Sequence, residues 1–118
     1  MELSILEQDG ITLIECSGEL DLSGSRQLKK FFMKLVLEQK DRFIISLREV
    51  TLIDSSGVGA LIFIASTVRK LELQFTFTET PERVMWLIEK IRLKSYLPFT
   101  DTLEKAAEQL GQDLLQEL

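Results

Sequence analysis

Four short stretches of the chain have the apolar patterning of β-strands. Residues 3–8 and 11–17 are β-prone and are separated by the pair Asp9-Gly10, which suits a two-residue turn with positive φ angles. We therefore expect an opening β-hairpin. Residues 43–47 form a continuous apolar run, as in a strand buried on both faces, and Gln74–Thr78 alternates phenylalanine with polar residues.

Apolar residues at intervals of three and four predict helices between these strands. Ser23 or Ser25 is the expected N-cap of the first helix, whose apolar stripe is Leu28, Phe31, Phe32, Leu35 and Val36. The second is expected to run from Ser56 to Lys70, deep against the sheet. Its buried stripe is Val58, Leu61, Ile62, Ala65 and Val68, widened by Phe63 and Ile64. A third helix is expected at 82–93, and a last helix buries Leu103, Ala107, Leu110 and Leu114.

The order of these elements predicts an α/β fold. Two strands are followed by alternating helices and strands, a short strand near Pro98 and the final helix. Strand–helix–strand units imply parallel pairing by right-handed crossovers, and the hairpin adds one antiparallel strand. We expect a small mixed, mostly parallel sheet with an N-terminal β-hairpin and about four helices. Residues 1–118 are expected to form a single domain.

Composition excludes several classes of function. The net charge of −5 disfavours nucleic acid as a partner. The absence of histidine removes Ser-His-Asp and Cys-His catalysis and every histidine metal site, so we expect neither a metal nor a cofactor. The lone Cys16 suits a reducing cytoplasm and is expected to be a core residue, and Trp86 is expected to pack partly into the core. No apolar run reaches the roughly 20 residues that cross a bilayer, so no membrane partner is expected.

The stretch LIDSSGVGALI, residues 52–62, carries the chemistry of the chain. Asp54 or Ser55 can cap the helix that begins there, and Gly57 and Gly59 can permit close approach of another surface or tight helix–sheet packing. Helix capping alone would explain the two serines. A phosphate-binding loop is disfavoured because no lysine is near and the G-x-x-x-x-G-K-[ST] pattern is absent. From the residues alone, a structural cap and a hydroxyl available to a partner both remain open.

A second acidic junction, Gly18-Glu19-Leu20-Asp21, follows the second predicted strand. Ligand contacts in open α/β sheets gather beyond the carboxyl ends of strands. If the two strands are parallel, Asp21 lies near Asp54 and Ser55. A pair of aspartates could serve acid–base chemistry, but the other groups that catalysis needs are missing, and we expect no enzyme.

These two motifs, in this order and at this distance, resemble the STAS domains of bacterial anti-sigma factor antagonists. The resemblance rests on Gly18-Glu19-Leu20-Asp21, on the run from Ile53 to Leu61 and on the order of elements. It implies that Ser55 is phosphorylated by an anti-sigma factor that is also a serine kinase. The antagonist would capture this kinase when Ser55 is free and release it when Ser55 is phosphorylated, and a metal-dependent phosphatase would restore capture.

The resemblance also implies a partner-binding surface around the serine. Its expected members are Asp21, Asp54, Ser55, Ser56, Gly57 and Gly59. A rival interpretation follows from the same family, because STAS domains also serve in lipid-transport complexes, stressosome-like scaffolds and anion transporters. In that case Ser55 would only cap a helix. A hydrolase that uses Asp21 and Asp54 is a third, disfavoured possibility.

Overall fold

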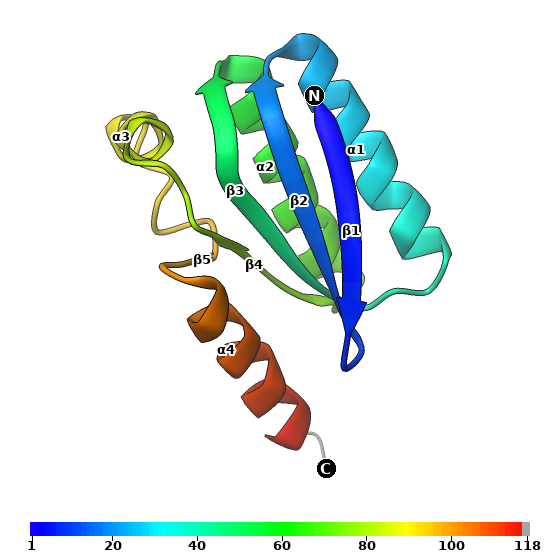
Figure 1. Ribbon diagram of the computed structural model, residues 1–118. Helices are drawn as coiled ribbons and strands as arrows, with labels where there is room; N and C mark the ends of the chain where they lie inside the picture. The colour runs from blue at the N-terminus through cyan, green and yellow to red at the C-terminus, as the bar shows by residue number, and fades with distance from the viewer. Residues whose placement is uncertain (117–118) are drawn as a thin grey trace.

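The computed structural model describes residues 1–116 and contains five strands and four helices in that range (Figure 1). In chain order they are β1 (Glu2–Gln8), β2 (Ile11–Leu20), α1 (Leu22–Leu37), β3 (Arg42–Ile53), α2 (Ser55–Lys70), β4 (Gln74–Thr78), α3 (Glu82–Lys90), β5 (Phe99–Thr100) and α4 (Leu103–Gln116). The α/β fold predicted from the sequence is confirmed. No helix within the described residues is long and apolar enough to span a membrane.

The five strands form one mixed sheet in the order β1-β2-β3-β4-β5. β1 pairs antiparallel with β2, and every other neighbouring pair is parallel. Because β2, β3 and β4 are adjacent in chain order, right-handed crossovers place α1 and α2 on the same face of the sheet. Figure 1 shows these two helices side by side behind the strands, with α4 separate from them.

The opening hairpin has the turn that its sequence predicts. Asp9 and Gly10 both have positive φ angles, 54° and 78°, which is the conformation of a type I′ turn. Both central strands are longer than predicted, since β2 continues to Leu20 and β3 to Ile53. The parallel ladder between them persists to the last residue pair despite two register shifts. The two strands therefore end level with each other.

Hydrophobic cores occupy both faces of the sheet. On the α1/α2 face, Phe32 of α1 packs against Phe43 of β3 with ring centroids 5.0 Å apart. On the opposite face, Ala106 and Leu110 of α4 pack against Leu13 of β2 and Ile44 of β3. The buried Cys16 belongs to the α1/α2 core, as predicted. α4 therefore covers part of the face that α1 and α2 leave open.

Several predicted burial positions are wrong. Ile62 and Phe63 of α2 are 43% and 39% exposed, because the sheet lies under the opposite side of this helix. Trp86 is 60% exposed rather than packed in the core, with the Lys90 ammonium 5.4 Å from its ring centroid. In α4 the buried alanine is Ala106, and Ala107 is exposed. The predicted burial of Leu114 falls on a side chain outside the described residues.

Candidate functional site

The two acidic junctions meet at one edge of the sheet. Leu20 and Ile53 are register partners at the ends of the parallel strands β2 and β3. Asp21 and Asp54 directly follow them, and the Asp54 N–H donates a hydrogen bond to the Leu20 carbonyl oxygen at 3.3 Å. The sequence-based expectation that these junctions lie together is therefore confirmed. We define the site as Asp21, Asp54, Ser55, Ser56, Gly57 and Gly59.

Each aspartate caps the helix that follows it. The Asp54 carboxylate accepts hydrogen bonds from the backbone N–H groups of Ser56 and Gly57, at 2.9 and 3.1 Å. The Asp21 carboxylate accepts one from Gly24 at 2.9 Å. The predicted caps of α1, Ser23 and Ser25, are wrong, because α1 begins earlier than its apolar stripe suggests. Both caps use donors that every helix N-terminus leaves without an intrahelical partner.

The two adjacent serines have different environments. Ser55 is the first residue of α2, one position earlier than predicted, and is exposed. Within residues 1–111, whose side chains the structure describes, its hydroxyl makes no hydrogen bond. Ser56 is half-buried, and its carbonyl oxygen accepts a 2.9 Å hydrogen bond from the hydroxyl of the buried Ser25. Ser55 is therefore available to another molecule, whereas Ser56 belongs to the contact between α1 and α2.

The two glycines also have different environments, since Gly57 is buried and Gly59 is exposed. A Cβ atom on Gly57 would collide with the carbonyl oxygen of Leu20 and with the Ile53 side chain. Gly57 thus permits the close approach of α2 to the strand ends, as tight helix–sheet packing requires. A Cβ atom on Gly59 would meet nothing within 4 Å, and Gly59 is exposed. Only Gly59 contributes open surface next to Ser55.

Two features of the site were missed from the sequence. Ser25, which the sequence predicts as a possible cap, instead donates its hydroxyl hydrogen bond to the backbone of α2 and so links α1 to α2. Leu22, directly after Asp21, is 53% exposed and adds an apolar side chain beside the aspartate. The sequence did indicate that Leu22 would be exposed, because it lies outside the apolar stripe of α1 that begins at Leu28. Ser25 gave no comparable indication, because its partner is 31 residues away.

The acidic side chains and the cysteine thiol are the other groups whose chemistry bears on the site. Among the described residues, no three His, Cys, Asp or Glu side chains form a group that could hold a metal ion. The thiol of Cys16 is also a poor nucleophile, since burial raises its pKa from 9.0 to about 12. The exposed chemical group that distinguishes the site is the hydroxyl of Ser55 above the N-terminus of α2.

Fold and site together define a small α/β domain with an exposed serine where a capped helix follows a buried strand. Residues 2–106 match the STAS domain family, and the chain belongs to this family. The expected family is therefore confirmed, over most of the chain.

Solved structures share the fold at low sequence identity. A Thermotoga maritima protein assigned as an anti-sigma factor antagonist superposes with a TM-score of 0.84 and 18% identity, over 91% of this chain and 92% of that one. The Bacillus cell fate determinant SpoIIAA, in its phosphorylated form, gives 0.71 and 16%, over 92% and 99%. A sulfate transporter family protein from Wolinella succinogenes gives 0.73 and 21%, over 96% and 93%.

Proposed function

We propose that this protein is an anti-sigma factor antagonist controlled by phosphorylation of Ser55. With Ser55 free, it binds an anti-sigma factor that is also a serine kinase; with Ser55 phosphorylated, it releases this partner. A metal-dependent phosphatase restores binding. The site itself carries out no catalysis, and the cytoplasm supplies the kinase and ATP. The observation that carries the proposal is the exposed Ser55 hydroxyl, which makes no hydrogen bond among the described side chains of residues 1–111.

The capping geometry supports this assignment of the serine. Asp54 satisfies the N–H groups of Ser56 and Gly57, so the fold does not need the Ser55 hydroxyl as a cap. Membership of the STAS family supports the same function, as does the similarity of this chain's fold to that of anti-sigma factor antagonists. One structural relative, SpoIIAA, has a phosphorylated form.

The proposed modification is an ordinary phosphoryl transfer. The Ser55 oxygen attacks the γ-phosphorus of ATP, the bond from this phosphorus to the ADP oxygen breaks, and the hydroxyl proton passes to a base of the kinase. ADP leaves, and Ser55 gains about −1.5 to −2 charges. In the dephosphorylation step, water attacks the phosphorus of phosphorylated Ser55, which releases inorganic phosphate and regenerates the hydroxyl.

The added charge acts mainly on the interface with the partner. At the N-terminus of α2 the helix dipole favours a dianion by up to about 1 kcal/mol, so the fold tolerates the phosphate. A partner surface fitted to a neutral hydroxyl, beside the carboxylates of Asp54 and Asp21, would bury an unpaired charge at a cost of several kcal/mol. The loss at the interface exceeds the local gain, and release needs no refolding.

Intact-mass measurement with candidate kinases and ATP tests the proposal. We expect wild type to gain one phosphate, Ser55→Ala to gain none, and the matched neighbour Ser56→Ala to gain one. Binding of each form to the kinase is then measured by calorimetry. A phosphorylated form that binds the kinase as tightly as the free form would overturn the proposal, as would a phosphate on another residue.

A scaffold or transport-assembly subunit is the second candidate, favoured by the structural match to a sulfate transporter family protein. In that case Ser55 would not be a phosphorylation site, and partner binding would be insensitive to Ser55→Asp. Wild type would gain no phosphate from any cognate kinase. The mass measurement therefore separates the two candidates.

A further inference from the structure

β1 is an edge strand that leaves apolar side chains exposed on both faces of the sheet. It pairs only with β2, and its sequence ELSILEQ has no proline or lysine to discourage pairing with another strand. Ile5, on the α1/α2 face, is 46% exposed, and Leu6, on the opposite face, is 58% exposed. Such an edge is a ready template for a further strand.

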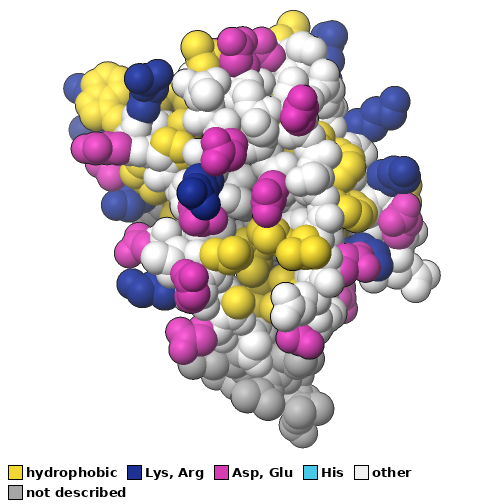
Figure 2. Space-filling model, in the orientation of Figure 1, with side chains coloured by type: hydrophobic (Ala, Val, Ile, Leu, Met, Phe, Trp, Pro, Cys, Tyr) yellow, Lys and Arg dark blue, Asp and Glu magenta, His cyan; other side chains and the backbone are white. Residues whose placement is uncertain are grey.

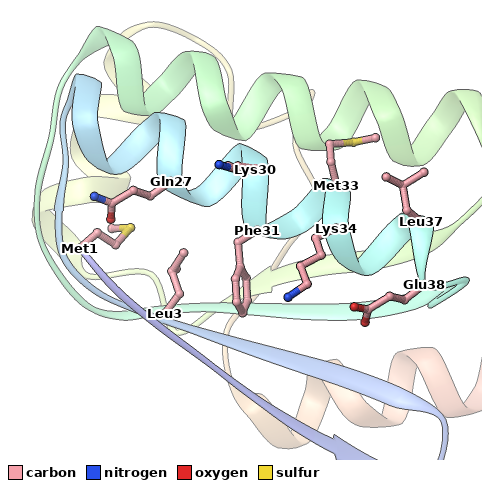
Figure 3. Close-up of a pocket in the computed structure, with 9 residues that line it drawn as sticks. All are labelled: Met1, Leu3, Gln27, Lys30, Phe31, Met33, Lys34, Leu37 and Glu38. Atoms are coloured by element: carbon pink, nitrogen blue, oxygen red, sulfur yellow. The ribbon is translucent and has the colours of Figure 1, made fainter.

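On the α1/α2 face, a groove lies between β1 and α1. The groove has a volume of about 790 Å³ and a mainly apolar lining that includes Leu3, Phe31 and Met33. Figure 3 shows Phe31 reaching from α1 to a position beside Leu3 of β1, with Lys34 on the other side of Phe31. A sixth strand beside β1 would place every second side chain in this groove, because side chains alternate between the two faces of a sheet.

The opposite face also has an uncovered apolar area at β1. Leu6 lines a smaller hollow of about 230 Å³ together with Leu13 of β2 and Leu103 of α4. Figure 2 shows hydrophobic side chains gathered on this face with acidic side chains around them. A strand added to β1 would therefore cover apolar surface on both faces.

The turn at Asp9-Gly10 fixes which backbone groups of β1 are free. In a two-residue hairpin the residues next to the turn, Gln8 and Ile11, form a hydrogen-bonded pair. Bonded and non-bonded pairs then alternate along the ladder. The N–H and C=O groups that point away from β2 are therefore those of Leu3, Ile5 and Glu7.

We propose that the occupant of this edge is a second copy of the chain, with the two β1 strands antiparallel about a two-fold axis at Ile5. In this register Ile5 of one copy pairs with Ile5 of the other, and Leu3 of each copy pairs with Glu7 of the other. All three residues with free backbone groups thus bond to one another. The result is a continuous ten-stranded sheet, twice the five strands of one copy.

The charges in the groove match those of a second β1. Glu7 of the second copy would stand opposite Leu3 on the α1/α2 side of the sheet, next to the groove that Lys30 and Lys34 line. The charged residues that line the groove are Lys30, Lys34 and Glu38. Within residues 1–111, whose side chains the structure describes, the two lysines take part in no ion pair. Glu7 is bonded to its own Lys40 at 2.6 Å, Nζ to Oε1, and can accept a second cation. A two-fold interface needs one patch that is complementary to itself, and β1 with its groove supplies both halves.

Cysteine cross-linking tests this register. In a hydrogen-bonded antiparallel pair the Cα atoms are about 5.5 Å apart, which is within the range of a disulfide. Ile5→Cys should therefore give a cross-linked dimer on mild oxidation. Leu6→Cys is the matched control, because Leu6 is more exposed but pairs with Ser4, which separates the two Leu6 positions by about 7–8 Å across the diagonal. Cys16 is buried and does not compete.

Sedimentation analysis over a concentration series measures the association itself. Wild type should dimerise reversibly, and Ile5→Lys, which places two ammonium groups at the axis, should weaken the dimer at least about tenfold. Leu71→Lys, the same kind of change at the far end of α2, should leave the dimer unchanged, and thermal unfolding confirms that both variants fold. A chain that stays monomeric, or Leu6→Cys that cross-links as fast as Ile5→Cys, would overturn the proposal.

Discussion

At the residue scale, Asp54 and Ser55 are neighbours with different roles. The Asp54 carboxylate accepts hydrogen bonds from two backbone N–H groups of α2, whereas the exposed Ser55 hydroxyl makes no hydrogen bond within residues 1–111. The aspartate therefore stabilises the fold, whereas the serine hydroxyl has no such bond. This division makes it possible to alter the proposed function of the site without altering the stability of the domain.

Alanine substitutions at these two positions should separate stability from modification. Asp54→Ala should lower the free energy of unfolding by about 1 kcal/mol, because it removes an N-cap. Ser55→Ala should change it by no more than about 0.5 kcal/mol, because an exposed and unbonded group is lost. Urea unfolding followed by circular dichroism measures both. A larger loss in Ser55→Ala than in Asp54→Ala would show that the serine, not the aspartate, is the structural residue.

At the scale of the element, the start of α2 is positioned by close packing against the strand ends. Gly57 lies against Leu20 and Ile53 with no room for a Cβ atom, and Ser25 of α1 bonds to the carbonyl oxygen of Ser56. These contacts hold the site between β2, β3 and α1. The exposed side of the same helix, at Ser55 and Gly59, takes no part in them.

The two glycines of α2 should respond to alanine in opposite directions. Gly57→Ala should destabilise the protein by about 1–3 kcal/mol, because the new methyl group overlaps backbone atoms that cannot move freely. Gly59→Ala should stabilise it by up to about 1 kcal/mol, since alanine is the better helix former and the space is open. Thermal unfolding of the pair gives the comparison. Similar effects of the same sign would contradict the close packing of Gly57 against the strand ends.

At the scale of the whole molecule, the sheet is covered unequally on its two faces. α1 and α2 cover one face, and α4 covers part of the other through Ala106 and Leu110, which pack on Leu13 and Ile44. The uncovered remainder adjoins β1 on both faces. The two proposed interaction surfaces, the Ser55 site at the ends of β2 and β3 and the dimer edge at β1, therefore lie on separate parts of the molecule.

The packing of α4 on the sheet should contribute substantially to global stability. Leu110 is fully buried, so Leu110→Ala should reduce the free energy of unfolding by about 2–5 kcal/mol. Glu108→Ala, an exposed change on the same helix, is the control and should have little effect. Denaturant unfolding of both variants checks this expectation. If Leu110→Ala were as stable as the control, α4 would not be part of the cooperative fold.

The sequence by itself determined the order of the elements, the hairpin and the place of the serine motif. These features depend on local patterns: the positive φ angles at Asp9-Gly10, the apolar run at 43–47, and small polar residues before a helix. Such patterns act over a few residues, and their physical preferences do not depend on distant contacts.

Only the tertiary structure decided which side of each helix is buried and which polar group serves the fold. Helical spacing could not distinguish the exposed Ile62 from the buried Ile64, because both lie in a continuous apolar run and the position of the sheet makes the choice. Nor could it show that Asp54 caps α2 while Ser55 stays free. Those outcomes depend on strands that pair across more than 30 residues of chain, and sequence neighbours carry no information about that pairing.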